Sequence, residues 1–414
     1  MANRCLIVPP HLLRAIADSV HNTDSVRESA RAALADYESR CAHHMASRKP
    51  VRPPGIIPPH IFQAVAESDD NDDETRAHAR NNLVIGERLG RSSLKIADAS
   101  SLPAEVEHVA ASKEKTKPLR SVYTMHNNED ETALPGKVVR TEGEPKVKDT
   151  VVNEAFDNVG TVLDFYKQHF KWHSIDNKNS DIVSTVHFGK AYENAFWDPE
   201  KLQMVFGDGG EFLNNFTGCI DVIGHELTHA ITEHTSPLDY NGQPGALNEH
   251  VSDVFGIMIK QKVQNETSEK ADWLIGEDCI LPGVKGTALR NMKAPGTAYN
   301  DPRFGKDPQV GNMSQYKTTF EDNSGVHIFS GIPNRAFYLT AVAFGGYSWE
   351  KAGQIWWKAM LSDQVHSQCT FKQFADITAS VAEKEFGKEA AHKVRTAWAT
   401  VGISRPADKQ QPGK

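Results

Sequence analysis

The chain has 414 residues, with 46 lysines and arginines against 54 aspartates and glutamates, and therefore a formal net charge of -8. This balance argues against a nucleic-acid-binding surface, because phosphate contacts are made by clustered basic residues. Hydrophobic residues make up 39% of the chain, as in ordinary globular proteins, and the length allows two or three domains. No apolar run approaches the roughly 18 to 20 residues of a membrane span, so we expect no integral membrane association.

The N-terminus carries only a short apolar run, from Cys5 to Val8, before the pair Pro9-Pro10. The hydrophobic core of a secretory signal is longer, about 7 to 15 residues. We therefore expect no classical signal peptide and a protein that is cytoplasmic as synthesised, with non-classical secretion as the alternative.

The first hundred residues contain an internal repeat, because the segment Ile7–Ser19 recurs as Ile56–Ser68. Each copy has an apolar stretch, a Pro-Pro pair and a short helical pattern. Units this short cannot bury a core alone, so each must lie on another surface, of this chain or of a partner. The polar stretch that follows is typical of a linker, and we expect proteolytic processing between His108 and Ser121.

The first chemical motif is His225-Glu226-Leu227-Thr228-His229. Two imidazoles four residues apart on a helix project from one face and can bind one tetrahedral metal ion. Glu226 lies beside them, close enough to take a proton from a water activated by the metal. Taken alone, the motif also fits surface histidines without a function.

A second segment, from Gly245 to Gly256, is amphipathic with helical period. It offers Glu249 as a third ligand and, one turn later, Asp253 as an acceptor for the free ring nitrogen of a ligating histidine. Three protein ligands leave one coordination position for water, which is typical of a catalytic zinc site.

A third segment places Asp322 five residues before His327, with a flexible Ser-Gly pair between them. If Asp322 accepts the imidazole proton, His327 is held oriented and partly cationic. Such a group can stabilise an oxyanion or protonate a leaving amine. Without the other segments, an exposed His-Asp contact explains the pattern equally well.

Together these three segments resemble the thermolysin family of zinc endopeptidases. The resemblance runs from about Val122 to Ile403 and includes shorter matches at residues 133–140, 194–197, 206–210 and 276–278. The Pro-Pro units resemble the short prosegment of the protealysin branch, which is present here twice instead of once. The implied fold is α+β, with a β-rich N-terminal half, an α-helical C-terminal half and the zinc helix between them, preceded by a small helical prosegment.

The resemblance and the local patterns divide the chain into four parts. We expect a prosegment over residues 1–113, a β-rich domain that ends in the zinc helix over 114–235, an α-helical domain over 236–404, and a flexible tail over 405–414. In the third part, helical periodicity predicts helices over 336–344, 349–361, 371–386 and 390–401.

The resemblance also implies a set of residues around one zinc ion. The ligands would be His225, His229 and Glu249, supported by Asn248 and Asp253. The catalytic residues would be the general base Glu226, the oxyanion-stabilising pair His327 and Tyr240, and Asp322, which orients His327.

Substrate binding is implied in the same way. Asn194 and Ala195 would pair with the peptide backbone as an added strand, and Arg290 would donate to a substrate carbonyl. The pocket for the primary side chain would be lined by Phe212, Phe216, Val222 and Leu289, which could equally be ordinary core residues. An apolar pocket implies cleavage on the amino side of Leu, Phe, Ile or Val.

Calcium is where the sequence departs from the family pattern. Asp221, Asp272 and Glu277 occupy positions of calcium-binding carboxylates, but Lys260 replaces a glutamate and Leu274 replaces another acidic residue. An ammonium among carboxylates repels a cation and can replace its charge. We expect at most one calcium ion.

These features predict a zinc-dependent neutral endopeptidase, made as a zymogen, that acts on proteins or peptides and is inhibited by its own prosegment. Which of the two prosegment copies inhibits is left open. A zinc aminopeptidase is a second possibility, although the chain lacks a Gly-x-Met-Glu-Asn segment to anchor a substrate amine. A third is a binding or inhibitor protein with a structural metal, in which the duplicated units engage a partner.

Overall fold

The computed structural model of the chain describes residues 55–95, 116–319 and 321–403, with the side chains of residues 90–95 left out. The described residues up to Ser92 belong to the same compact unit as those from residue 116 onward. The first copy of the repeat and the expected tail over 405–414 lie outside the described residues.

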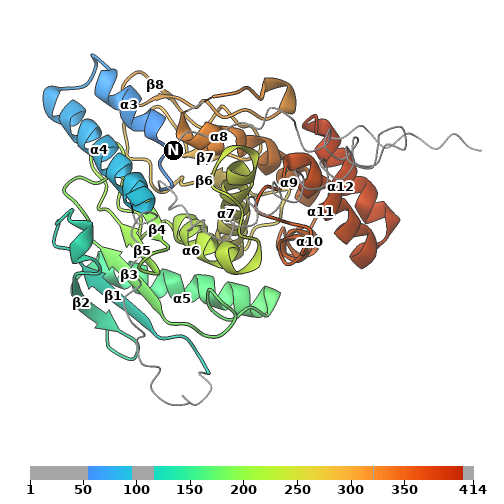
Figure 1. Cartoon of the computed structure of the whole chain (residues 1–414), viewed down its shortest axis with the longest axis horizontal. Coiled ribbons are helices and arrows are strands. Elements are labelled where there is room, and N and C mark those ends of the chain that lie inside the picture. The colour runs from blue at the N-terminus through green and yellow to red at the C-terminus, as the bar shows by residue number, and fades with distance from the viewer. Residues whose placement is uncertain (1–54, 96–115, 320, 404–414) are drawn as a thin grey trace, which may run out of the picture. The chain divides into compact units, whose positions relative to one another are not determined.

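A five-stranded sheet forms the core of the N-terminal half (Figure 1). Its strands run in the order β2-β1-β3-β5-β4, in which β1 pairs with β3 and β3 with β5 in parallel, and the two outer pairs are antiparallel. The strands are β1 (Arg120–Thr124), β2 (Lys137–Thr141), β3 (Ile182–Val186), β4 (Ala195–Asp198) and β5 (Gln203–Phe206). β4 lies at one edge of this sheet.

One long helix, α5 (Thr150–Phe170), connects β2 to β3 and packs against the sheet. β2 and β3 are not neighbours, because β1 lies between them, so a tight turn cannot join them and the connection has to cross β1. The side chain of Asp149 accepts from the backbone N–H of Val151 at 3.0 Å and so caps the helix. Buried apolar residues recur at helical spacing along its sheet-facing side, namely Val152, Phe156, Val159 and Tyr166.

Two helices, α6 (Ile220–Thr235) and α7 (Gly242–Gln264), lie side by side between the sheet and the C-terminal helices (Figure 1). Their close approach depends on glycine. A Cβ atom on Gly256 would lie 2.6 Å from the backbone oxygen of Asp221, and one on Gly224 would lie 3.1 Å from the Cα of Gly256. This approach brings the polar residues of the two helices against each other inside the protein.

The C-terminal half is helical, as the sequence predicts. Its helices are α8 (Asp322–Phe329), α9 (Gly331–Phe344), α10 (Lys351–Met360), α11 (Phe371–Phe386) and α12 (Lys388–Thr400). Two short hairpins pair β6 (Leu274–Ile275) with β7 (Arg290–Asn291) and β8 (Asn300–Asp301) with β9 (Gly305–Lys306), and two 3₁₀ turns cover η2 (Glu131–Ala133) and η3 (Met313–Gln315). A capping box at Thr370 and Gln373 fixes the start of α11.

The second copy of the repeat forms α3 (Pro59–Glu67) and α4 (Asp73–Lys95). α3 begins with Pro59, whose missing N–H is not needed at a helix start. Farther on, Ile85 and Leu89 of α4 join a buried cluster with residues of the sheet half, including Met125, Leu134 and Phe188. None of the described helices is both long and apolar enough to cross a membrane. The expected α+β fold, with a β-rich N-terminal half and an α-helical C-terminal half, is confirmed.

Candidate active site

Three buried donors from two helices converge where α6 meets α7. His225 and His229 lie one turn apart on α6, with their Nε2 atoms 3.1 Å from each other. Glu249 reaches them from α7, with one carboxylate oxygen 3.4 Å from Nε2 of His225 and the other 3.5 Å from Nε2 of His229. Among the described residues, this is the one group of three or more such side chains with metal-binding geometry.

Supporting residues fix which nitrogen of each imidazole faces the group. Nδ1 of His225 lies 2.9 Å from the Asp253 carboxylate, and Nδ1 of His229 lies 2.8 Å from the Oδ1 atom of Asn248. Because both partners accept hydrogen bonds, both Nδ1 atoms carry the proton and both Nε2 atoms present a lone pair. Two lone pairs and a carboxylate that face one another need a cation between them.

The donor set fits zinc. Two ligands about 2.0 to 2.1 Å from a tetrahedral ion are roughly 3.3 Å apart, which is close to the three separations observed here. One oxygen of Glu249 is buried without a hydrogen-bond partner, as expected for an atom that a metal would satisfy. The charges of His327 and His225 outweigh the burial of Glu249 and hold its pKa well below the usual range, so it is an anionic ligand.

Glu226 lies between the two histidines on α6 and is fully buried. Neither carboxylate oxygen has a hydrogen-bond partner. Burial raises the pKa of Glu226 to about 8, and the negative charge of Glu249 adds to this rise. The backbone N–H of Trp197 in β4 acts in the opposite direction and favours the ionised form. The carboxyl group is therefore poised to gain or lose a proton near neutral pH.

His327 lies beside this group, held by Asp322. Its Nδ1 is 2.6 Å from one Asp322 oxygen, and its backbone N–H donates to the other at 2.9 Å. Asp322, Asn323 and Ser324 all have positive φ angles, each costing of order 1 kcal/mol, and this unusual turn aims the carboxylate at His327. Burial lowers the pKa of His327, but the Asp322 charge outweighs it and the net pKa is raised.

The remaining ring nitrogen of His327 points back to the metal group. It lies 3.4 Å from the Glu249 carboxylate and is buried without a hydrogen-bond partner. The Tyr240 hydroxyl donates to the other oxygen of Glu249, and burial raises the pKa of Tyr240 well above its usual value. The structure thus brings together all the residues that the sequence assigned to the metal and to the catalytic groups.

A second layer of contacts was not predicted. Arg290 donates to both oxygens of Asp253, at 2.8 and 2.6 Å, and Asn334 donates to one of them at 2.8 Å. These residues are 37 and 81 positions from Asp253, so no local pattern indicates the contact. They leave Asp253 fixed and anionic behind His225, because the charge of Arg290 offsets the burial that raises the Asp253 pKa.

The three residues expected to bind a peptide backbone contact the prosegment instead. The carbonyl of Ala195 accepts from the Ile56 N–H at 3.0 Å, and the Asn194 side chain exchanges hydrogen bonds with the backbone of Ile57 at 2.9 and 3.1 Å. Arg290 donates to the Ile56 carbonyl at 3.0 Å. The prosegment therefore occupies the edge of β4 that faces away from β5.

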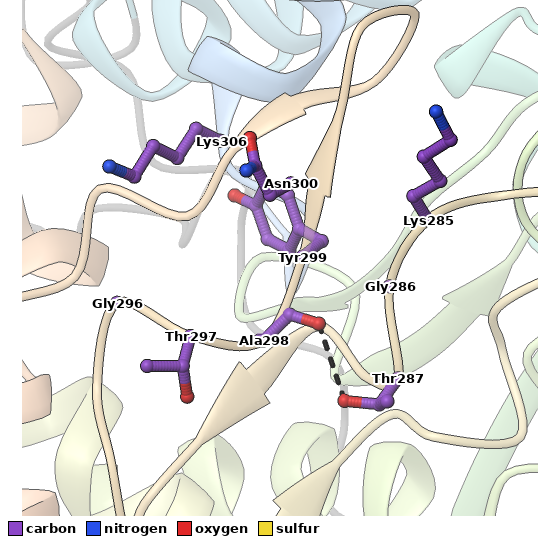
Figure 2. A pocket seen from close by; sticks show the side chains of 9 residues that line it. All are labelled: Lys285, Gly286, Thr287, Gly296, Thr297, Ala298, Tyr299, Asn300 and Lys306. Atoms are coloured by element: carbon purple, nitrogen blue, oxygen red, sulfur yellow. Dashed lines mark hydrogen bonds between the residues drawn. The ribbon is translucent and has the colours of Figure 1, made fainter.

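The expected pocket residues are core residues in this structure. All four are buried in the same continuous apolar cluster as Ile56, namely Phe212, Phe216, Val222 and Leu289. A separate cavity of about 450 Å³, between Lys285–Thr287 and Gly296–Asn300, is lined by none of them and by none of the metal-group residues (Figure 2). It is linked to the prosegment through Tyr299, whose hydroxyl lies 3.0 Å from Nε2 of His60.

At the expected calcium position the structure contains an ammonium group. Lys260 of α7 is 2% exposed and donates to Glu277 at 2.8 Å, to the Leu274 carbonyl at 3.0 Å and to Asp272 at 3.4 Å. Asp221 accepts from the Gly276 N–H at 2.7 Å. Burial lowers the pKa of Lys260, but the charges of Asp221, Glu277 and Asp272 outweigh it and raise the pKa.

Comparison with known proteins identifies three matching segments. Residues 98–233 match the thermolysin metallopeptidase catalytic domain, residues 236–403 match its alpha-helical domain, and residues 54–84 match the protealysin propeptide. The solved precursor of protealysin, a metalloproteinase from Serratia proteamaculans, is 43% identical, with a TM-score of 0.74 over 84% of this chain and 99% of that chain. The family is zinc-dependent, in agreement with the donor set.

Two curated relatives correct our expectation on location. The extracellular metalloprotease of Pectobacterium carotovorum is 48% identical over 68% of this chain and 80% of its own length. The extracellular minor metalloprotease of Serratia marcescens is 43% identical over 48% of this chain and 56% of its own length. Both names contradict the cytoplasmic location inferred from the short apolar run. The inference failed because the lack of a recognisable signal pattern does not determine where a protease acts. From these matches, the chain belongs to the thermolysin family of metallopeptidases and carries a protealysin-type propeptide.

Proposed function

We propose that this metallopeptidase is a zinc endopeptidase whose ligands are His225, His229 and Glu249. The observation that carries the proposal is the convergence of three buried lone-pair donors beside Glu226, a buried carboxylate without a hydrogen-bond partner. When bound, zinc supplies Lewis-acid chemistry, polarising a carbonyl and lowering the pKa of water towards about 7. Three converging ligands, rather than the four of a structural site, favour a catalytic metal over the alternative of a binding protein.

In this proposal Glu226 is the general base and proton shuttle. It accepts a proton from the attacking water and delivers it to the nitrogen of the departing amine. Its pKa, raised by burial, suits a group that must both take up and release a proton near neutral pH. The absence of hydrogen-bond partners leaves both of its oxygens available for this role.

His327 and Tyr240 are the proposed donors to the oxyanion that forms when the carbonyl is attacked. Asp322 holds the imidazole through Nδ1, so the proton on the opposite nitrogen points towards the metal group. Donors positioned before the reaction need no reorganisation when charge develops, and one such donor typically contributes about 100-fold in rate.

Substrates are proposed to bind along the edge of β4. Asn194, Ala195 and Arg290 already contact a peptide backbone there, that of the prosegment. Phe212, Phe216, Val222 and Leu289 belong to the same continuous apolar cluster as Ile56 of the prosegment, which supports a preference for a bulky apolar side chain. We therefore propose cleavage on the amino side of Leu, Phe, Ile or Val.

The second copy of the repeat is the proposed inhibitor. It covers the groups assigned to substrate and makes further contacts through Ser68, which donates to the Pro302 carbonyl at 2.8 Å, and Asn71, which donates to the Arg303 carbonyl at 2.9 Å. The proposed boundaries remain a prosegment over 1–113 and catalytic domains over 114–235 and 236–404, with maturation between His108 and Ser121.

We also propose that no calcium ion binds among Asp221, Asp272 and Glu277. Lys260 contacts two of these carboxylates and the nearby Leu274 carbonyl directly, which supports its role as a covalently attached cation. This proposal is compatible with at most one calcium ion elsewhere in the chain.

The proposed function is tested with an N-terminally blocked peptide library and mapping of the new N-termini. We expect internal cleavage with Leu, Phe, Ile or Val at the new termini, which also excludes the aminopeptidase alternative. Changing Glu226→Gln should lower the rate by at least about 100-fold while zinc stays bound. Changing Glu233→Gln is the matched control, because Glu233 lies on the same helix and bonds to Trp197 instead. Equal rates for the two variants would contradict the assigned base.

A further inference from the structure

Residues Gly55 to Ile57 lie along the edge of β4. The Ile56 N–H donates to the Ala195 carbonyl, and the backbone of the following residue, Ile57, exchanges hydrogen bonds with the side chain of Asn194, which directly precedes β4. Since the numbering of the two segments runs in opposite directions, the prosegment lies antiparallel to β4. Gly55, the residue before Ile56, therefore lies on the side towards Trp197.

In this direction β4 continues to Trp197, whose backbone N–H favours the ionised form of the proposed general base, Glu226. In an extended strand, residues two apart present their backbone groups to the same edge, so Ala195 and Trp197 both face the prosegment. The Trp197 N–H is the β4 group that acts on the Glu226 carboxylate. The nitrogen of the Gly55–Ile56 bond donates to the Ala195 carbonyl, and the bond lies on the side of Ala195 towards Trp197.

The Ile56 side of this bond is held by Arg290, which is linked to the metal group through Asp253. Arg290 donates to the Ile56 carbonyl and, through its other nitrogens, to Asp253, which accepts from the ligand His225. The Ile56 side chain is fully buried and belongs to the same continuous apolar cluster as the four residues of the proposed specificity pocket. A bulky apolar residue therefore follows the Gly55–Ile56 bond, as the proposed specificity requires.

We propose that Gly55–Ile56 is an internal processing site, cut by the protein's own active site. Water adds across the bond: the carbon–nitrogen bond breaks, the hydroxyl goes to the Gly55 carbonyl carbon and the proton to the Ile56 nitrogen. The cut detaches residues 1–55, with the first copy of the repeat, and leaves the second copy docked with Ile56 as its N-terminus. This inference rests on the proposed function and names a bond of this chain as its substrate.

The sequence before each isoleucine distinguishes the two copies. Gly55 has a φ of 102°, and a Cβ on it would lie 2.6 Å from the Ala195 oxygen and 2.7 Å from the Asn194 side chain. The first copy has Leu6 at the matching position, before Ile7. A side chain there cannot take this seat without moving the strand edge, so the Leu6–Ile7 bond is not a substrate.

Docking residues farther along also differ between the copies. Asn82 donates to the Ala191 carbonyl at 3.1 Å and accepts from the Glu193 N–H at 2.9 Å, and Ile85 is buried. The first copy has Ala33 and Asp36 in their places. The first copy therefore lacks the side chains that make these contacts in the second copy.

The test uses the full chain, purified with zinc and incubated, with intact mass and N-terminal sequencing over time. We expect a fragment that begins at Ile56, no fragment that begins at Ile7, and neither in Glu226→Gln. Changing Gly55→Leu should slow the cut by about tenfold or more, because the bond is displaced from the reacting groups, whereas Leu6→Gly should have no effect. Changing Ile56→Asp, with Ile7→Asp as its control, tests the same bond without a change at the glycine.

A blocked peptide added to the same incubation distinguishes a failure of this inference from a failure of the proposed function. A protein that cuts this peptide but never yields an Ile56 terminus overturns the inference and leaves the proposed function intact. A protein that cuts neither, under conditions where zinc is bound, contradicts the proposed function itself. An Ile56 terminus that forms equally in Glu226→Gln would point to a contaminating protease and also overturn the inference.

Discussion

Two charged clusters are centred on buried residues of the α6–α7 helix pair, and one of them contains its own cation, the Lys260 ammonium. In the metal cluster, His225, His229 and Glu249 turn lone pairs towards a common point. In the lysine cluster, about one turn earlier on α6 and three turns later on α7, the Lys260 ammonium stands among Asp221, Asp272 and Glu277.

The difference shows how the same helix pair supports structure at one end and chemistry at the other. A buried carboxylate is costly unless a positive charge compensates it. Lys260 compensates permanently and leaves no position for another ligand. The metal cluster would need an ion that brings an open coordination position, and the proposed catalytic groups beside it, the Glu226 carboxylate and Nε2 of His327, have no hydrogen-bond partner.

The strongest way to break the lysine cluster is Lys260→Met, which keeps the volume and removes the charge. We expect a loss of about 3 kcal/mol in unfolding free energy, at the low end for a broken buried ion pair because Asp272 and Glu277 are partly exposed. Chemical denaturation measures the loss. The control Lys262→Met, on the exposed side of the same helix, should change stability by less than about 0.5 kcal/mol.

The same variant sharpens the comparison through calcium. Without the ammonium, the carboxylates and the Leu274 carbonyl become a set of oxygen ligands of the kind that calcium prefers. Millimolar calcium should therefore raise the melting temperature of Lys260→Met and leave the wild-type value nearly unchanged. An equal calcium effect on both proteins would contradict the role given to Lys260.

A smaller effect is expected at His187, a titratable counterpart of Lys260. This imidazole lies between Asp208, at 2.7 Å, and Asp149, at 2.9 Å, and the hydrogen bond to Asp208 is the main cause that raises its pKa to about 9. Its stabilising effect is complete below about pH 6.5, the unfolded value, and is lost as pH rises through about 9. Because the aspartates are partly exposed, we expect about 1 kcal/mol or less.

Unfolding free energies measured at several pH values between 6 and 10 test this expectation. Between about pH 7 and 10 the unfolding free energy of the wild-type protein should fall relative to that of His187→Gln. The variant should lack the part of the pH dependence that comes from the histidine. A wild-type stability that rises relative to the variant with increasing pH would show that the histidine is not held by its charge.

The sequence predicts contacts within one element well and contacts between distant elements only where a family pattern exists. His225 and His229 are recognisable because helical spacing alone places them together. The bidentate contact of Arg290 with Asp253 depends on how β7 packs on α7, and the bond from Ile56 to Ala195 depends on the docking of the prosegment. Neither leaves a periodic signal. The long helix α5 is a different case, because its apolar residues recur at helical spacing and give a local signal that the expected β-rich half left out.

The central claim is that His225, His229 and Glu249 bind a zinc ion. Elemental analysis of the purified chain tests it most directly, with Glu249→Ala measured beside the wild type. We predict about one zinc per wild-type chain and far less in the variant, because loss of one of three ligands removes a large part of the affinity. A wild-type chain without zinc, or a variant that retains the full amount, would contradict the claim.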